Sequence, residues 1–588
     1  MVVLKISFLA TLMFAKYAAA IWPIPASYEH GSEVVWIDRT TKWEFDCPNG
    51  LDPLIDRRVR RAIDRAKHTT LNKQLVPWKF KPPGVDFDPP TDGRYHSTIR
   101  RVIIQQLSSN ETRAPAYEQM DESYELYLPG PKGIQSTDSE LLETLIQKYG
   151  RMSIAYIIAP KSAGLIQALT TFSQLFYAHT KNGVYSPLAP VAIKDKPKFV
   201  HRGVNLDTSR QWYPKAAILR VIDGMAWNKF NRLHFHVTDS QSWPLEVPSM
   251  PELALKGAYY KGLHYSTSDV QDIYMYAEDR GIQVIMEIDM PGHTSSIGLA
   301  YPTLITGQNI QPLWTNVAAQ PPSGHLKLNN TNVEDFLTSL FNDVVPRLIP
   351  YCKYFHTGGD EVNKNIYLLD EGVKSADHAV IKPYLERFLK HAHDAVRKNG
   401  ATPFVWEEMV LDWGVDLPKD VIVQAWLGDE SVKGAVTKGY RVIAGTYQNW
   451  YLDCGNGQWL DFHNDSFYPY NDWCGPKKNW RAMYSYDPAN GLSAGQAKLV
   501  LGGEVHIWSE QIDEYSIDST VWPRAGAAGE VLWSGRRDAQ GKNRTFSDAS
   551  PRLAEIRERM VNWGIAASPI MQLWCHQHDG DCQYPDTA

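Results

Sequence analysis

Short apolar runs alternate with stretches of helical periodicity along most of the chain. The apolar runs predict β-strands at 199–206, 232–238, 282–288, 354–356, 402–406, 421–426, 441–444 and 498–502. Apolar positions at helical spacing predict helices between several of them, most clearly at 214–229, 268–280, 333–348 and 382–398. Eight strands alternating with helices predict an α/β fold, in which residues 196–588 form a (β/α)8 TIM barrel with a C-terminal extension.

A smaller pattern of strands and helices precedes the barrel. Residues 124–128 alternate like a strand, residues 152–159 form a second apolar run, and residues 164–177 have helical periodicity. These elements predict a small α+β domain over residues 101–195.

The region before that domain, residues 21–100, is rich in Pro, Trp and charge. It contains one amphipathic stretch that predicts a helix at 54–71. Basic pairs, which are processing sites in many secreted precursors, occur at Arg57-Arg58, Arg60-Arg61 and Arg100-Arg101. A separate segment at 21–100 that is cut off near residue 100 is therefore one interpretation of this region.

The first twenty residues have the pattern of a secretory signal. Lys5 supplies positive charge, residues 6–15 are largely apolar, and residues 18–20 are three alanines suited to cleavage. A membrane anchor is disfavoured because the apolar run is too short and Lys16 interrupts it. We expect residues 1–20 to be a signal peptide, the protein to be secreted and extracellular, and no membrane to be a partner.

The composition describes a soluble globular protein, with 43% hydrophobic and 21% charged residues. A net charge of −6 without a long Lys/Arg block argues against a nucleic-acid partner. The 20 Trp and 30 Tyr are many for this length, and aromatic faces stack on sugar rings as readily as they fill cores. The composition therefore favours a carbohydrate ligand without deciding for it.

Cysteine usage agrees with secretion. The six cysteines are Cys47, Cys352, Cys454, Cys474, Cys575 and Cys582. We expect disulfides between Cys454 and Cys474 and between Cys575 and Cys582, since each pair closes a short loop. The spacing does not show whether the other two cysteines bond to each other, and no ligand spacing indicates a metal site. Glycosylation sequons consistent with secretion occur at Asn110, Asn329, Asn464 and Asn543.

The most informative feature is the sequence Phe-His-Thr-Gly-Gly-Asp-Glu-Val-Asn at 355–363. Asp360 and Glu361 follow an apolar strand and the two glycines Gly358 and Gly359, which let the backbone bend and a ligand approach. Adjacent carboxylates raise each other's proton affinity, a cost that makes sense if one member acts as an acid. An exposed Asp-Glu pair in a turn is the plainer alternative, but the apolar run and the glycines disfavour it.

The other predicted strands also end in polar or aromatic residues, where the active site of a barrel lies. These residues are Arg202 and Asp207, His236 to Asp239, Glu287 to His293, Trp406 to Glu408, Gln424 to Trp426, Tyr451 to Asp453, and Glu504 with Trp508 and Glu510. Any one of them has a structural explanation, such as a core tryptophan or a surface charge. Their coincidence at every strand end favours an active site.

The motif His-Thr-Gly-Gly-Asp-Glu-Val resembles the signature of the family 20 glycoside hydrolases, the β-N-acetylhexosaminidases. The resemblance is collinear from about residue 198 to about residue 574, and the layout is most similar to the secreted fungal enzymes. It implies exo-acting release of terminal N-acetylglucosamine, and also of N-acetylgalactosamine, from chitooligosaccharides and glycoconjugates. It further implies a homodimer, a propeptide at 21–100 that is retained non-covalently, and no cofactor.

The resemblance also assigns roles to the residues at the strand ends. Glu361, Asp360 and Tyr451 match the catalytic residues, with Tyr451 donating to the acetamido carbonyl. The implied substrate-binding and supporting residues are Arg202, Asp239, Asp289, His293, Trp406, Trp426, Asp453, Trp508 and Glu510. Among these, the arginine and Glu510 are expected to hold sugar hydroxyls and the tryptophans to wall the pocket.

Because Asp360 and Glu361 are neighbours in sequence, they cannot readily straddle a glycosidic bond as nucleophile and acid. We therefore expect the acetamido oxygen of the substrate to attack the anomeric carbon, with retention and an oxazolinium intermediate. A chitinase-like barrel is the main alternative, but its Asp-x-x-Asp-x-Asp-x-Glu motif is missing from the sequence. An inactive sugar-binding barrel and a metal-dependent hydrolase are less favoured.

Overall fold

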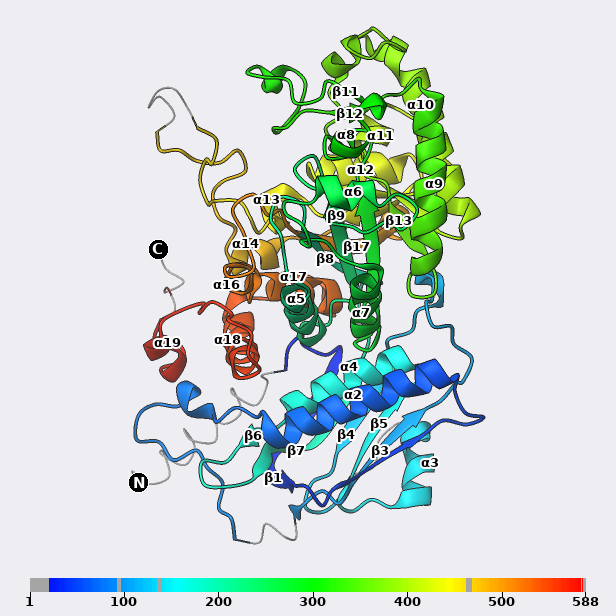
Figure 1. Ribbon diagram of the computed structural model, residues 1–588. Coiled ribbons are helices and arrows are strands. Elements are labelled where there is room, and N and C mark those ends of the chain that lie inside the picture. The colour runs from blue at the N-terminus through cyan, green and yellow to red at the C-terminus, as the bar shows by residue number, and fades with distance from the viewer. Residues whose placement is uncertain (1–20, 93–96, 135–138, 462–467, 583, 585–588) are drawn as a thin grey trace.

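The computed structural model describes residues 21–92, 97–134, 139–461, 468–582 and 584. The expected signal peptide at 1–20 and the sequon at Asn464 lie outside these residues. A domain built on an open sheet lies at one end of the barrel, with the helices α2 and α4 between the sheet and the barrel (Figure 1). Within the described part of the chain, no helix is long and apolar enough to cross a membrane.

The open sheet has the strand order β1-β7-β4-β5-β3-β2, and β6 pairs with β7. Its strands are β1 (Ser27–Ile37), β2 (Lys42–Asp46), β3 (Arg101–Gln106), β4 (Tyr124–Leu128), β5 (Ile154–Ala159), β6 (Tyr177–Ala178) and β7 (Val184–Asp195). Its helices are α2 (Pro53–Asn72), α3 (Glu140–Tyr149) and α4 (Ser162–Gln174). Apolar side chains of α2 and α4 cover one face of the sheet and those of α3 the other, which buries both faces.

The domain boundary expected at residue 100 is wrong. Residues 21–100 supply β1, β2 and α2 to the same sheet, and β2 pairs in parallel with β3 across that boundary. Two of the basic pairs lie inside α2, where Val59 and Ala62 are buried against the sheet. The region is therefore part of the folded domain, because its apolar side chains belong to the core of that domain. Cleavage near residue 100 would leave β1, β2 and α2 attached to the domain by strand pairing and core packing alone.

The barrel is closed and has eight parallel strands, which confirms the fold expected from the sequence. The strands are β8 (His201–Asp207), β9 (Arg232–Thr238), β10 (Gln283–Ile288), β13 (Tyr354–His356), β14 (Thr402–Trp406), β15 (Ile422–Ala425), β16 (Arg441–Ala444) and β17 (Val500–Ile507). The largest difference from the expected boundaries is β17, which continues through Gly502 and Gly503 instead of ending there. A Cβ on Gly503 would collide with the Trp450 ring, so this glycine serves close packing and not a turn.

The helices around the barrel include the four expected ones. These are α5 (Lys215–Trp227), α7 (Thr267–Glu278), α9 (Thr331–Leu348) and α10 (His378–Lys398). The shorter helices are α6 (Glu252–Gly257), α8 (Ile297–Ala300), α11 (Glu408–Leu411), α12 (Asp429–Thr437), α13 (Tyr447–Trp450), α14 (Trp480–Ser485) and α15 (Ala494–Ala497). The C-terminal part contains α16 (Ile517–Val521), α17 (Arg524–Ser534), α18 (Phe546–Asn562) and α19 (Leu573–Gln577). A small pair of strands, β11 (Ile305–Thr306) and β12 (His325–Leu326), lies in the long loop after β10.

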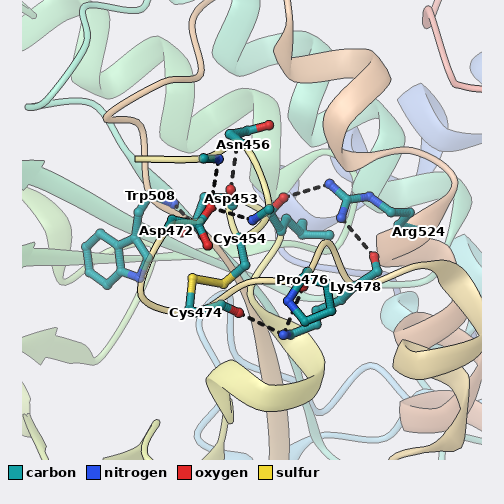
Figure 2. The surroundings of a disulfide bond; sticks show 12 residues. Asp453, Cys454, Asn456, Asp472, Cys474, Pro476, Lys478, Trp508 and Arg524 are labelled. Atoms are coloured by element: carbon teal, nitrogen blue, oxygen red, sulfur yellow. Dashed lines mark hydrogen bonds between the residues drawn. A yellow bond between two sulfur atoms is a disulfide. The ribbon is translucent and has the colours of Figure 1, made fainter. Parts of the chain in front are cut away.

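Both expected disulfides form, Cys454–Cys474 and Cys575–Cys582. Cys47 and Cys352 are both free, so they do not bond to each other. Figure 2 shows the first disulfide in the long loop after α13, with Asp453 and Trp508 on one side and Arg524 on the other. This disulfide therefore fixes a loop that borders the carboxyl ends of the barrel strands.

Candidate active site

The loop after β13 carries the two adjacent carboxylates and bends as the glycines predict. β13 ends at His356, and Gly358 and Gly359 then have φ of 67° and 109°. A Cβ on Gly358 would overlap the Asp289 carboxylate, so only glycine fits this turn. The N–H of Gly359 donates to Asp289 Oδ1 at 2.9 Å, which ties the loop to the end of β10. Because the strand has already ended, the carboxylates can point into the same space.

Asp360 and Glu361 have different surroundings. The Asp360 side chain is 13% exposed, whereas that of Glu361 is 36% exposed. Asp360 hydrogen-bonds the carboxyl group of Asp289, which requires one of the two to be protonated. Burial raises the pKa of Asp360, and burial with the charge of Asp360 raises the pKa of Asp289 further, well above its usual range, so we assign the shared proton to Asp289. Asp360 is thereby held as an acceptor, and Glu361 is left facing solvent.

Glu361 lies beside a histidine that a buried carboxylate holds in place. Its Oε2 is 3.3 Å from His293 Nε2, and His293 Nδ1 is 3.0 Å from Asp239 Oδ1. Burial alone would lower the pKa of His293, but Asp239 and Asp360 raise it well above the usual range. The imidazolium can therefore donate to both carboxylates, which fixes the position of Glu361.

Arg202, the arginine expected to bind sugar, is not in this site. It is the second residue of β8 and lies at the opposite end of the barrel, where its guanidinium pairs with Glu122 of the sheet domain at 2.6 Å. The arginine at the carboxyl end of the strand is Arg210, three residues beyond β8. Its guanidinium pairs with Asp207 at 3.2 Å and with Asp239 at 2.9 Å, and it lies over the Trp508 ring. Its buried Nε has no acceptor among the described residues.

Four aromatic residues at the ends of different strands lie next to one another. Trp406 is 6.1 Å from Trp508 between ring centroids, and Tyr451 is 6.3 Å from Trp508. Trp426 is stacked on Tyr451 with the centroids 6.2 Å apart. These distances describe one continuous aromatic wall of the kind that contacts the apolar face of a sugar.

Two further carboxylates close the site on the side of the Cys454–Cys474 disulfide. Asp453 and Glu510 border a cavity of about 350 Å³ together with Glu361 and Trp426. Burial raises the pKa of Asp453 well above its usual range, with Glu510 adding to the rise. The cavity therefore brings together residues from the ends of four strands that the sequence placed in one site.

Glu408, at the start of α11, is a site residue that the sequence placed at a strand end without assigning it a role. Its Oε1 accepts a hydrogen bond from the indole of Trp426 at 2.8 Å, and its buried Oε2 has no partner among the described residues. Burial, and next the charge of Asp360, raise the pKa of Glu408 well above its usual range. Its side chain is therefore neutral and anchors one tryptophan of the aromatic wall. The sequence signal was a second acid directly after Glu407, which follows the end of β14 at Trp406.

We expect Glu408→Gln to keep most of the activity, because the amide is neutral and still accepts from the Trp426 indole. Glu408→Ala removes that bond, worth about 1–2 kcal/mol, and should lower kcat/KM on an aryl N-acetylglucosaminide about 5- to 30-fold. Equal kcat/KM values for the two variants would show that this bond does not matter.

Some carboxylates and histidines of the site lie close enough to share a cation. These groups are Asp239, Asp289 and His293, and His293, Asp360 and Glu361. Their atoms already hydrogen-bond or pair with one another, so the arrangement is complete with protons alone. The expectation of a site without metal or cofactor stays a prediction.

The chain matches two family models. Residues 199–536 match the catalytic domain of glycosyl hydrolase family 20, and residues 21–175 match a "beta-acetyl hexosaminidase like" domain. The second match crosses residue 100, in agreement with the continuous sheet. The chitinase-like and inactive-barrel alternatives are not favoured by these matches.

Curated relatives and solved structures are similar over most of the chain. A beta-hexosaminidase of Arthroderma benhamiae is 40% identical, with 96% of this chain and 97% of the relative covered. A chitooligosaccharidolytic beta-N-acetylglucosaminidase of Bombyx mori is 32% identical, with 79% and 75% covered. The structure of a chitobiase from Flavobacterium johnsoniae has a TM-score of 0.70 at 23% identity, with 95% of this chain and 74% of that one covered, and shares the fold. The chain belongs to glycosyl hydrolase family 20 and is an exo-acting β-N-acetylhexosaminidase.

Proposed function

We propose that this β-N-acetylhexosaminidase works by substrate-assisted catalysis with Glu361 as the acid and Asp360 as the group that orients the acetamido nitrogen. The observation that carries the proposal is the contrast between the two adjacent carboxylates. Asp360 is held inward as an acceptor by the protonated Asp289, while Glu361 opens onto the cavity beside His293. Two acids with different surroundings are suited to two different roles.

In the first step Glu361 gives its proton to the glycosidic oxygen, and the aglycone leaves as an alcohol. The acetamido oxygen of the same sugar attacks C1, which forms a cyclic oxazolinium ion. Asp360 accepts a hydrogen bond from the acetamido N–H and stabilises the positive charge that develops there. Glu361 then takes a proton from water, which opens the ring at C1 with net retention. Tyr451 donates to the acetamido oxygen and holds it near C1.

The remaining residues of the site bind and orient the sugar. The guanidinium of Arg210 takes the role expected of Arg202, that of holding hydroxyls of the terminal sugar, with Asp453 and Glu510 as acceptors. The aromatic wall of Trp406, Trp426 and Trp508 contacts the ring and the acetamido group. Asp239 and His293 keep the acid in position.

For the substrate we propose chitooligosaccharides and glycoconjugates with terminal N-acetylglucosamine, and also N-acetylgalactosamine. The support is the name of the Bombyx mori relative and the aromatic lining of the cavity, which continues outward through Trp459 and Trp473. We also propose secretion, supported by the two disulfides and by Asn110, Asn329 and Asn543 being exposed. The homodimer stays a prediction from resemblance. The propeptide at 21–100, retained non-covalently, also stays a prediction from resemblance.

The test of participation is to replace the 2-acetamido group of an aryl glycoside by hydroxyl. We expect turnover to fall by about 10³-fold or more, since the intramolecular nucleophile is lost. NMR of the first product formed from the acetamido substrate should show the β-anomer. Comparable turnover of both substrates, or an α-anomer as first product, would contradict the mechanism.

A further inference from the structure

The contacts of the acid continue beyond Asp239 into the interior of the barrel. His293 bridges Glu361 and Asp239 at 3.3 and 3.0 Å, and the other oxygen of Asp239 is 2.9 Å from His236 Nε2. His236 Nδ1 is 2.5 Å from Glu287 Oε2. The same Glu287 oxygen is 2.8 Å from His234 Nε2, and His234 Nδ1 is 2.7 Å from Glu504 Oε1. Carboxylates and imidazoles therefore alternate from Glu361 at the mouth of the site to Glu504 on β17. We call this series of side chains the carboxylate–imidazole chain.

The interior part of this chain is fully buried, because His234, His236, Glu287 and Glu504 are at most 1% exposed. Unpaired charges in that position would cost much free energy. Each of these groups touches partners of opposite charge on both sides, except that Glu504 ends on Gln424 and His201. Each buried ionisable group is therefore paired with its neighbours, an arrangement that residues which only fill a barrel do not need.

Burial and charge act against each other along the chain. Burial alone would lower the pKa of His234, but Glu504 and Glu287 raise it to about 9. In the same way Glu287 and Asp239 overcome burial and raise the pKa of His236 well above its usual range. Burial would raise the pKa of Glu287, yet the neighbouring histidines hold it well below its usual range. At neutral pH the chain therefore alternates in charge.

The chain also reaches the sugar-binding wall. The other oxygen of Glu287 accepts a hydrogen bond from the indole of Trp406 at 2.8 Å. Since Trp406 is part of the aromatic wall, Glu287 connects this wall, through His236, to the residues that hold the acid in place. A change in Glu287 or His236 can thus reach both halves of the active site without touching the substrate.

We propose that His236, Glu287, His234 and Glu504 are positioning residues that set the proton affinity of the acid Glu361 from the barrel interior, through Asp239 and His293. The proposal rests on the role of Glu361 given above. The cation on His236 stabilises the ionised form of Glu361 through space and orders the contacts between them. Removing that cation should therefore move the alkaline limb of the activity–pH profile upward.

Other charged groups face the chain and remain in place when His236 is changed. Glu361 faces Asp360 as well as His293. Asp239 also pairs with Arg210, and His293 also faces Asp360 and His325. Glu287 also faces His356 and Asp289. Replacing His236 removes its contacts to Asp239 and Glu287 and also its ring contact to Trp508, so the readout must be the pH dependence of activity and not a loss of activity alone.

The test uses His236→Gln and His236→Asn in the full-length enzyme. Gln places an amide near the Nε2 position facing Asp239, and Asn places one near Nδ1 facing Glu287, so both remove the charge but keep different contacts. We expect the alkaline limb of kcat/KM against pH to move up by roughly 0.5–1 pH unit in both variants. The substrate is an aryl N-acetylglucosaminide with a poor leaving group, for which protonation by the acid limits the rate.

His201→Gln is the matched control. His201 is equally buried in the barrel and lies 3.2 Å from Glu504, but burial lowers its pKa to about 4, so the substitution removes no charge at neutral pH. We expect His201→Gln to lower the thermal midpoint and leave the pH profile unchanged. Unshifted profiles in both His236 variants, or a downward shift, would overturn the proposal.

A measurement on the unmodified enzyme keeps the proposal testable if the variants do not fold. With ¹⁵N-labelled histidine, three imidazolium signals should persist above pH 8, as expected for His234, His236 and His293. A single such signal, that of His293 alone, or none would refute the alternation of charge in the interior. Failure of the proposed function is a separate result. An active Glu361→Gln enzyme would show that Glu361 is not the acid. An inactive Glu361→Gln enzyme with unshifted His236 variants would show only that the interior residues do not influence the acid.

Discussion

Glu361→Gln should lower kcat/KM on a glycoside with a poor leaving group by about 10²- to 10⁴-fold, the range of a lost general acid. The reason is that the amide keeps the shape of Glu361 and its place beside His293 but has no proton to transfer. The loss should be much smaller for a dinitrophenyl glycoside, whose leaving group departs without protonation. The measurement is kcat/KM against the pKa of the leaving group for the variant and the unmodified enzyme.

Asp360→Asn is the matched comparison from the neighbouring position. If Asp360 stabilises the oxazolinium cation, its loss should cost about 10²- to 10³-fold for good and poor leaving groups alike. The substitution keeps a carbonyl acceptor but removes the charge that helps to raise the pKa of Asp289, so it also disturbs the pair on which the inward position depends. Equal sensitivity of both variants to the leaving group would contradict the division of labour between the two carboxylates.

The barrel could be predicted because each strand is a short apolar run whose period differs from that of the helices. The expected and observed bounds agree within a few residues for seven strands and fail for β17. There the two glycines indicate a strand end, but Gly503 is required by the close approach of Trp450 and Gly502 by that of the His201 backbone, contacts that depend on the closed barrel. Close packing between segments far apart in sequence leaves the same glycine signal as a turn.

The carboxylate pair could be predicted because the glycines, the strand and the acids are neighbours in sequence. The proton on Asp289 could not, since it depends on the approach of two loops after β10 and β13. The alternating chain inside the barrel was equally hidden. His234 and His236 occupy alternate positions of β9, which indicates a shared face but not which carboxylates that face meets.

The prediction for Arg202 failed because the role of a residue depends on its position along the strand. β8 runs from His201 to Asp207, so Arg202 stands at its amino end and cannot reach a site at the carboxyl ends of the strands. Counting from the end of the predicted strand would have selected Arg210. Whether a polar residue lies at the amino or the carboxyl end of a barrel strand therefore says more about the role of that residue than its presence in the strand does.

The same substitution at these two arginines should give opposite results. Arg210→Lys keeps a charge beside Asp207 and Asp239 but loses the planar fork, so we expect kcat/KM to fall about 10- to 100-fold. Most of the loss should be in KM, because the contacts to sugar hydroxyls are made before and during the reaction. The thermal midpoint should change little in comparison.

Arg202→Lys should instead affect stability. Its guanidinium donates to both oxygens of Glu122, at 2.9 and 2.6 Å, and this buried pair joins the barrel to the sheet domain together with the pair of Lys229 and Asp195. Breaking such a buried pair costs about 3–5 kcal/mol, and a lysine that keeps one contact loses part of this. We expect a lower thermal midpoint with kcat/KM within about 3-fold of the unmodified enzyme, since the site lies at the other end of the barrel. A rise in KM in Arg202→Lys without a change in Arg210→Lys would restore the assignment that the structure rejects.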